Sequence, residues 1–146
     1  MIRALLDTNI YISYLLDPYA TGTIVQIVDA AIAGLYVPLL PGELLQEMSE
    51  AIERKKSLSL RIKLEDVQRL ASLMRRSGGT LAPIGEQIPD ITRDIKDDYL
   101  LAYAAIEQAD YLVTGDLDLL VLQQVGRVKI ITPADFLAVL KQLPSP

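Results

Sequence analysis

Short apolar runs alternate with amphipathic stretches along most of the chain, and this alternation limits the possible folds more than any other feature. The runs with the length and composition of buried strands are residues 2–6, 35–40, 80–84, 111–114 and 128–131. Strands that alternate with helices usually form a mainly parallel sheet covered on both faces. The sequence therefore predicts an α/β fold.

The stretches between these runs follow helical spacing. Helices are expected over residues 10–16, from 21 or 23 to 34, over 41–54, over 57–76 in one or two pieces, and over 94–108, 117–125 and 133–143, with a loop at 85–93. Thr132 and Pro133 form a typical helix start, with threonine as N-cap and proline at the first position. The length of 146 residues and the absence of a linker or repeat predict one domain over residues 1–146.

Two missing residue types narrow the chemistry. The chain has no Cys and no His, which excludes disulfides, thiolate nucleophiles, His-ligated metals and Ser-His-Asp triads. Catalysis would have to use carboxylates, Lys, Arg, hydroxyl groups or bound ions. No secretory signal or membrane span is expected, because the apolar residues 2–6 end at Asp7. Together with the absence of Cys, this predicts a cytoplasmic protein.

Four acidic residues stand beside apolar residues where expected elements begin or end, in four separated segments. They are Asp7, Glu47, Asp97 and Asp116. Carboxylates that converge from distant segments repel one another, and a divalent cation can neutralise them. Ligand sets made only of oxygen suit Mg²⁺ or Mn²⁺. The four acids therefore predict a metal-dependent site for phosphoryl transfer, first of all a nuclease.

Two of the acids follow expected strands. Asp7 comes directly after the first strand and Asp116 just after the strand at 111–114, and sites in parallel sheets form beyond the carboxyl ends of strands. Helix N-capping by Asp7 and a turn at Asp116 are the structural alternatives. Asp118 could be a ligand, a cap or a turn residue.

Helical phase selects the other two acids. Glu47 lies nearest the apolar face of its helix, which contains Leu44 and Met48. Asp97 falls on the same side of its helix as Leu101, whereas Asp98 is rotated by about 100°. For Asp97 the alternative is a first-turn position, where negative charge is favoured.

The basic residues are concentrated in one segment. Eight of the 14 Lys and Arg residues lie in residues 54–76, although the chain as a whole has a formal net charge of −5. Such a surface could bind a phosphate backbone, and the alternative is a solvated pair of helices. The candidate RNA-binding residues are Arg54, Lys55, Lys56, Arg61 and Lys63.

The acidic motifs together resemble those of PIN-domain ribonucleases, in particular the VapC-like toxins of prokaryotic toxin–antitoxin systems. The similar stretches are Leu5 to Asn9, Leu44 to Glu47, Asp97 to Leu101, Ala109 to Leu120 and the closing segment Thr132 to Leu137. Two stretches depart from the family pattern: Leu40-Pro41-Gly42 stands where the family often has Ser-Pro before the second acid, and Ile95 follows Asp94 where the family often has Pro. Both departures keep the carboxylates.

The resemblance implies a three-layer α/β/α sandwich with a mainly parallel five-stranded sheet of order 3-2-1-4-5. It also implies Mg²⁺ or Mn²⁺ held by the four acids, an RNA substrate, a homodimer and a small cognate antitoxin. With no His, the expected nucleophile is a metal-activated water. Thr8, Asn9 and Thr114 are expected to orient the carboxylates, with Asp118 as a weaker candidate. The number of carboxylates fits either one metal ion or two.

Two other functions remain open at this point. An Asp after the first strand could be a phosphorylated nucleophile, as in haloacid-dehalogenase-like phosphatases or receiver domains. Those phosphatases need a second Asp where this chain has Asn9, and a receiver needs a late Lys that Lys129, inside an expected strand, supplies poorly. A non-catalytic RNA-binding module on the same fold is the third possibility.

Overall fold

The computed structural model describes residues 1–76 and 95–143, and of residues 95–98 it describes the backbone alone. Its centre is a five-stranded sheet with the strand order β2-β1-β3-β5-β4. The strands are β1 (Arg3–Leu6), β2 (Val37–Leu39), β3 (Tyr111–Val113), β4 (Gln124–Val125) and β5 (Val128–Ile131). All neighbours pair in parallel except β4 and β5. The prediction of an α/β fold with a mainly parallel sheet is confirmed.

Helices connect the strands. They are α1 (Thr8–Leu16), α2 (Thr23–Ile32), α3 (Gly42–Arg54), α4 (Lys56–Ser59), α5 (Leu64–Arg76), α6 (Ile95–Ile106), α7 (Leu117–Leu120) and α8 (Pro133–Lys141). Thr132 caps α8 by accepting a hydrogen bond from the Asp135 N–H at 3.2 Å, as the sequence predicted. No helix within residues 1–76 and 95–143 combines the length and the apolar character needed to span a bilayer.

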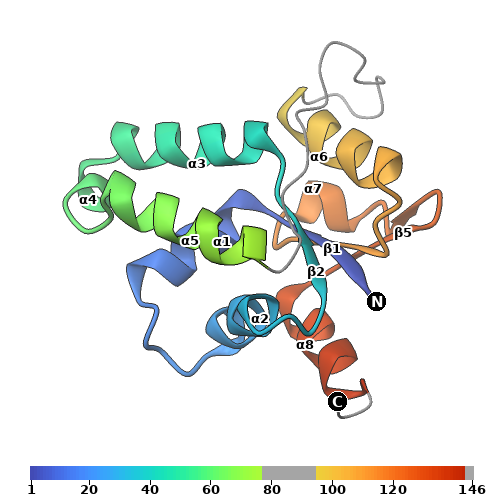
Figure 1. Cartoon of the computed structure of the whole chain (residues 1–146). Coiled ribbons are helices and arrows are strands. Elements are labelled where there is room, and N and C mark those ends of the chain that lie inside the picture. The colour runs from blue at the N-terminus through green and yellow to red at the C-terminus, as the bar shows by residue number, and fades with distance from the viewer. Residues whose placement is uncertain (77–94, 144–146) are drawn as a thin grey trace.

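The sheet lies between two groups of helices (Figure 1). Helix α6 packs on β1 and β3, whereas α2 and α8 pack together on the opposite side of the strands. Helices α3 and α5 extend beyond β2 and pack against each other and, through α3, against α1. The three layers bring the N-terminal ends of α1 and α6 and the body of α3 to one end of the sheet.

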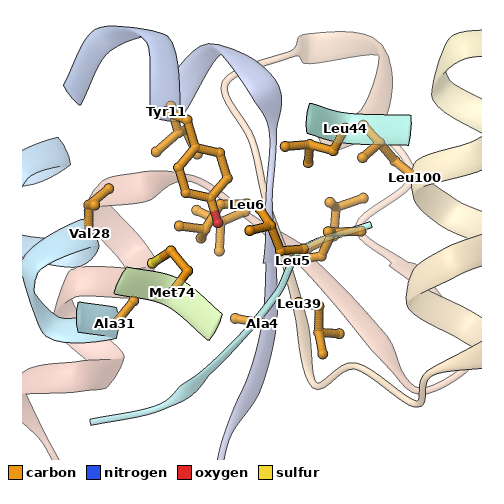
Figure 2. Packing of buried hydrophobic residues seen from close by; sticks show 14 of the residues in the cluster. Ala4, Leu5, Leu6, Tyr11, Val28, Ala31, Leu39, Leu44, Met74 and Leu100 are labelled. Atoms are coloured by element: carbon orange, nitrogen blue, oxygen red, sulfur yellow. The ribbon is translucent and has the colours of Figure 1, made fainter. Parts of the chain in front are cut away.

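The first strand is the centre of the core. Ala4, Leu5 and Leu6 have no exposed surface, because β1 has a strand on each side and helices on both faces. In Figure 2, Leu44 of α3 and Leu100 of α6 point toward each other near Leu5. A strand enclosed in this way needs apolar residues at consecutive positions rather than alternating ones, which is the pattern of residues 4–6.

The structure differs from the sequence prediction after Asp116. A helix was expected over residues 117–125, but α7 ends at Leu120 and residues 124–125 form β4. Val125 pairs with Val128 across the two-residue turn Gly126-Arg127, and Gly126 has a φ of +59°. Glycine at the first central position with positive φ is the pattern of a type II′ hairpin turn. The expected strand at 80–84 and loop at 85–93 lie outside the described residues.

A leucine pair tests the core. Leu5→Ala should lower the free energy of unfolding by about 2–5 kcal/mol, because it removes buried carbon atoms and leaves a cavity in the packed core. Leu117→Ala, at a residue that is 78% exposed on α7, should change it by less than about 0.5 kcal/mol. Urea unfolding in metal-free buffer measures both values. Similar losses from the two substitutions would contradict the central place of β1.

Candidate metal centre

The carboxyl ends of the central strands lie side by side. The Asp7 backbone N–H donates to the carbonyl of Val113 at 3.0 Å, and the Thr114 N–H donates to the carbonyl of Ile131 at 3.0 Å. These bonds continue the ladders of β1 with β3 and of β3 with β5 by one residue. The residues that follow the three strands therefore start at the same edge of the sheet, as expected for sites in parallel sheets.

The hydroxyl of Thr114 connects two of the predicted acids. It donates to Oδ2 of Asp7 at 2.7 Å and accepts the backbone N–H of Asp116 at 3.0 Å. Thr114 has no exposed surface. A hydroxyl can donate one hydrogen bond and accept others, and that of Thr114 does both. Thr114 therefore holds the carboxylate of Asp7 and the backbone of Asp116 in place.

Asp7 occupies the N-cap position of α1, yet its side chain makes no capping bond to that helix. The carboxylate is turned toward Thr114 instead. Burial raises the pKa of Asp7, and the charges of Glu47 and Asp116 raise it further, while hydrogen bonds from Thr114 and the Thr8 backbone act in the opposite direction. The carboxylates of Glu47 and Asp116 therefore each lie close enough to the Asp7 carboxylate to repel it.

Asp116 begins α7. Its Oδ1 accepts the backbone N–H of Asp118 at 2.9 Å, which is an N-cap bond. Capping uses only the Oδ1 atom of Asp116. Asp116 can therefore cap α7 and still offer its other carboxylate oxygen to a metal ion. The side chain of Asp118 is exposed, and Asp118 contacts Asp116 through its backbone N–H.

Glu47 reaches the same region from α3. Its side chain is half-buried, and its Oε2 accepts a hydrogen bond from the hydroxyl of Tyr99 on α6. Tyr99 is only 8% exposed. Burial, followed by the hydrogen bond to Glu47 and the charge of that carboxylate, raises the pKa of Tyr99, so the hydroxyl remains a proton donor at neutral pH. The sequence analysis gave Tyr99 no role.

The other residues that the sequence predicted for the site differ in how far they are buried. Thr8 is 4% exposed, and its hydroxyl has no hydrogen bond of normal geometry to any residue in the described ranges, although it lies close enough to influence Tyr99. Asn9 is exposed. Asp97 lies in the first turn of α6, and its side chain is not among those described. The structure therefore brings Asp7, Glu47 and Asp116 together.

The basic candidates lie on the far part of α3 and on α4 and the loop after it. All five are exposed; they are Arg54, Lys55, Lys56, Arg61 and Lys63. The Arg61 guanidinium donates to the carbonyl of Leu16 at 3.0 Å, so it also ties this segment to the end of α1. Arg54 follows Glu47 by seven residues, or about 10 Å along the helix.

The acidic cluster has the donor chemistry of a site for a hard divalent cation. Among the described side chains, those of residues 1–76 and 99–143, no ion pair includes Asp7, Glu47 or Asp116, so none of the Lys and Arg side chains in those ranges neutralises them by direct contact. The buried Thr8 hydroxyl lies beside Tyr99 and adds a further oxygen near the acids. Among the described side chains, no three acids are close enough to form a complete metal cage.

The comparison with protein families decides the classification. The family model described as PIN domain matches residues 3–118, a range that includes Asp7, Glu47, Asp97 and Asp116. The chain belongs to the PIN-domain family. PIN domains are generally nucleases that act on nucleic acid and need a divalent metal ion. The comparison with curated proteins found no match, and neither did the comparison with solved structures.

Replacement of one acid tests whether repulsion among Asp7, Glu47 and Asp116 destabilises this PIN domain in the absence of metal. In EDTA, Asp7→Asn should raise the melting temperature, because it removes a half-buried charge that two neighbouring acids oppose. Millimolar Mn²⁺ should then stabilise the native protein, by about 2.7 kcal/mol at 100 times Kd, and should stabilise the variant far less. Differential scanning fluorimetry measures both effects.

Asp17→Asn is the matched control, since Asp17 is exposed at the opposite end of α1. It should leave both the metal-free melting temperature and the response to Mn²⁺ unchanged. An Asp7→Asn protein that gains as much stability from Mn²⁺ as the native chain would remove Asp7 from the metal centre.

Proposed function

We propose that residues 1–146 form a single PIN nuclease domain that acts as a divalent-metal-dependent endoribonuclease. The observation that carries this proposal is the convergence of Asp7, Glu47 and Asp116 at one edge of the sheet, where none of the described Lys and Arg side chains forms an ion pair with them. Asp97, from the first turn of α6, is proposed as the fourth acid. The four acids would hold Mg²⁺ or Mn²⁺.

The residues around the acids would prepare the site for hydrolysis of a phosphodiester. When bound, the cation lowers the pKa of a water molecule and offsets charge on the phosphoryl group and the leaving group. Thr114 holds Asp7 in place before the ion arrives, and the N-cap bond to Asp118 does the same for Asp116. Glu47 is proposed to bind the ion or to orient the attacking water.

The biological setting is proposed from the motifs. The stretch from Ala109 to Leu120 resembles the fourth motif of VapC-like toxins, which supports a role as the toxin of a toxin–antitoxin pair in the cytoplasm. The partners would then be an RNA substrate, a small cognate antitoxin and a second copy of this chain in a homodimer.

Membership of the PIN-domain family favours nuclease chemistry over the phosphatase and receiver alternatives. The first test is a cleavage assay on labelled single-stranded and structured RNAs with Mg²⁺, Mn²⁺ or EDTA. Cleavage that needs the metal supports the proposal. Tight RNA binding without cleavage in either metal would instead support the non-catalytic RNA-binding alternative.

Two neighbouring residues of equal charge give a sharper test. Asp97→Asn should abolish RNA cleavage, because a ligand that loses its charge holds the cation weakly. Asp98→Asn, about 100° away around α6, should keep most of the activity and lose at most about 0.3–1 kcal/mol of stability. Rates are measured at saturating Mn²⁺ on proteins shown to be folded by circular dichroism. Equal losses would show that helical phase assigned the wrong residue.

The basic segment provides a separate prediction. Reversing Lys55, Lys56 and Lys63 to Glu should weaken RNA binding and flatten its dependence on salt, because each lost phosphate contact reduces the slope by about 0.7 for single strands. Fluorescence anisotropy at several salt concentrations measures both quantities. Reversing Lys129 and Lys141, which lie on β5 and α8, is the control. If the triple variant keeps the RNA affinity and the salt dependence of the native protein, the basic segment does not bind RNA.

A further inference from the structure

We infer that Tyr99 is a positioning residue that holds the Glu47 carboxylate in place for the metal ion. This inference rests on the proposed function, because it gives Tyr99 a part in the same metal centre. It goes beyond that proposal by naming a residue outside the acidic set whose neutral hydroxyl decides where one of the carboxylates points.

The contact joins two helices that are distant in the sequence. Glu47 lies on α3 and Tyr99 on α6, and the Tyr99 hydroxyl donates to Oε2 of Glu47 across the end of the sheet. Leu44 and Leu100, each close in sequence to one member of this pair, point toward each other in the core (Figure 2). Leu44 is 0% exposed and Leu100 is 3% exposed, so the hydrogen bond lies at the edge of the apolar core.

The two side chains differ in how much freedom they have. A glutamate has three side-chain torsions and, when half-exposed, samples several rotamers. A tyrosine has two, and at 8% exposure the ring of Tyr99 is confined by its neighbours. Because the Tyr99 ring is confined, its hydrogen bond to Oε2 of Glu47 restricts the rotation of the whole carboxylate, including Oε1. Groups that orient ligands in this way change metal affinity or activity strongly when they are removed.

The same helix supplies a matched control. Tyr103 lies one turn after Tyr99 on α6 and is also buried, at 1% exposure. Its hydroxyl has no hydrogen-bond partner among the described side chains, those of residues 1–76 and 99–143. Tyr99→Phe and Tyr103→Phe therefore remove the same atom from the same helix in similar burial, and only the first removes a contact with an acid of the metal centre.

The experiment measures the Mn²⁺ dissociation constant by electron paramagnetic resonance, together with kcat and KM for a labelled RNA. Tyr99→Phe should weaken Mn²⁺ binding about 10- to 100-fold, whereas Tyr103→Phe should stay within about twofold of the native protein. Glu47→Asp is the second variant, since it keeps the charge but draws the carboxylate one methylene away from Tyr99. It should weaken Mn²⁺ binding similarly, and adding Tyr99→Phe to it should change little more.

Each outcome decides a separate point. Equal Mn²⁺ affinity in Tyr99→Phe and Tyr103→Phe, or an undiminished effect of Tyr99→Phe in the Glu47→Asp protein, overturns the positioning role and leaves the nuclease proposal standing. Mn²⁺ binding that depends on Tyr99 without RNA cleavage in the native protein supports the positioning role and overturns the nuclease proposal. A native protein that binds no Mn²⁺ overturns both. If Tyr99→Phe does not fold, unchanged affinity in Glu47→Asp is sufficient to reject the inference.

Discussion

The parallel pairing of β1 with β3 is the constraint on which the candidate metal centre depends. It places Asp7 beside the end of β3, where the Asp7 N–H binds the carbonyl of Val113. Thr114, the next residue along, then reaches the Asp7 carboxylate with its hydroxyl. The backbone ladder and the side-chain contact agree only in this register, since a shift of one residue would turn the side chains to the other face of the sheet.

The cost of this arrangement is electrostatic. Burial and the charges of Glu47 and Asp116 all disfavour the ionised form of Asp7, and hydrogen bonds from Thr114 and the backbone only partly offset them. A fold that keeps such a cluster gives up stability in the absence of a cation and recovers it when one binds, because binding to the native state alone shifts the folding equilibrium. With the proposed metal bound at these acids, stability and metal affinity would therefore be coupled in this domain.

Local rules were enough to predict much of the fold and to select Asp7, Glu47 and Asp116, which the structure places near one another. Consecutive apolar residues identified β1, strand ends identified Asp7 and Asp116, and helical phase selected Glu47. The β4 hairpin was missed because β4 has only two residues, although Gly126 was a readable turn signal. Tyr99 was missed because its partner is 52 residues away, and no local pattern predicts a hydrogen bond between α3 and α6.

The described side chains that donate to the acids are neutral hydroxyls, and their neutrality matters for the proposed metal centre. Tyr99 and Thr114 each give one hydrogen bond to a carboxylate without adding charge. A Lys or Arg in either place would hold the carboxylate as firmly, but it would also neutralise it and repel an incoming cation. Neutral hydroxyls fix the direction of the ligands and leave their negative charge available. Among the described side chains, the polar contacts around the cluster are thus those expected where an external cation, rather than a protein cation, completes the proposed balance of charge.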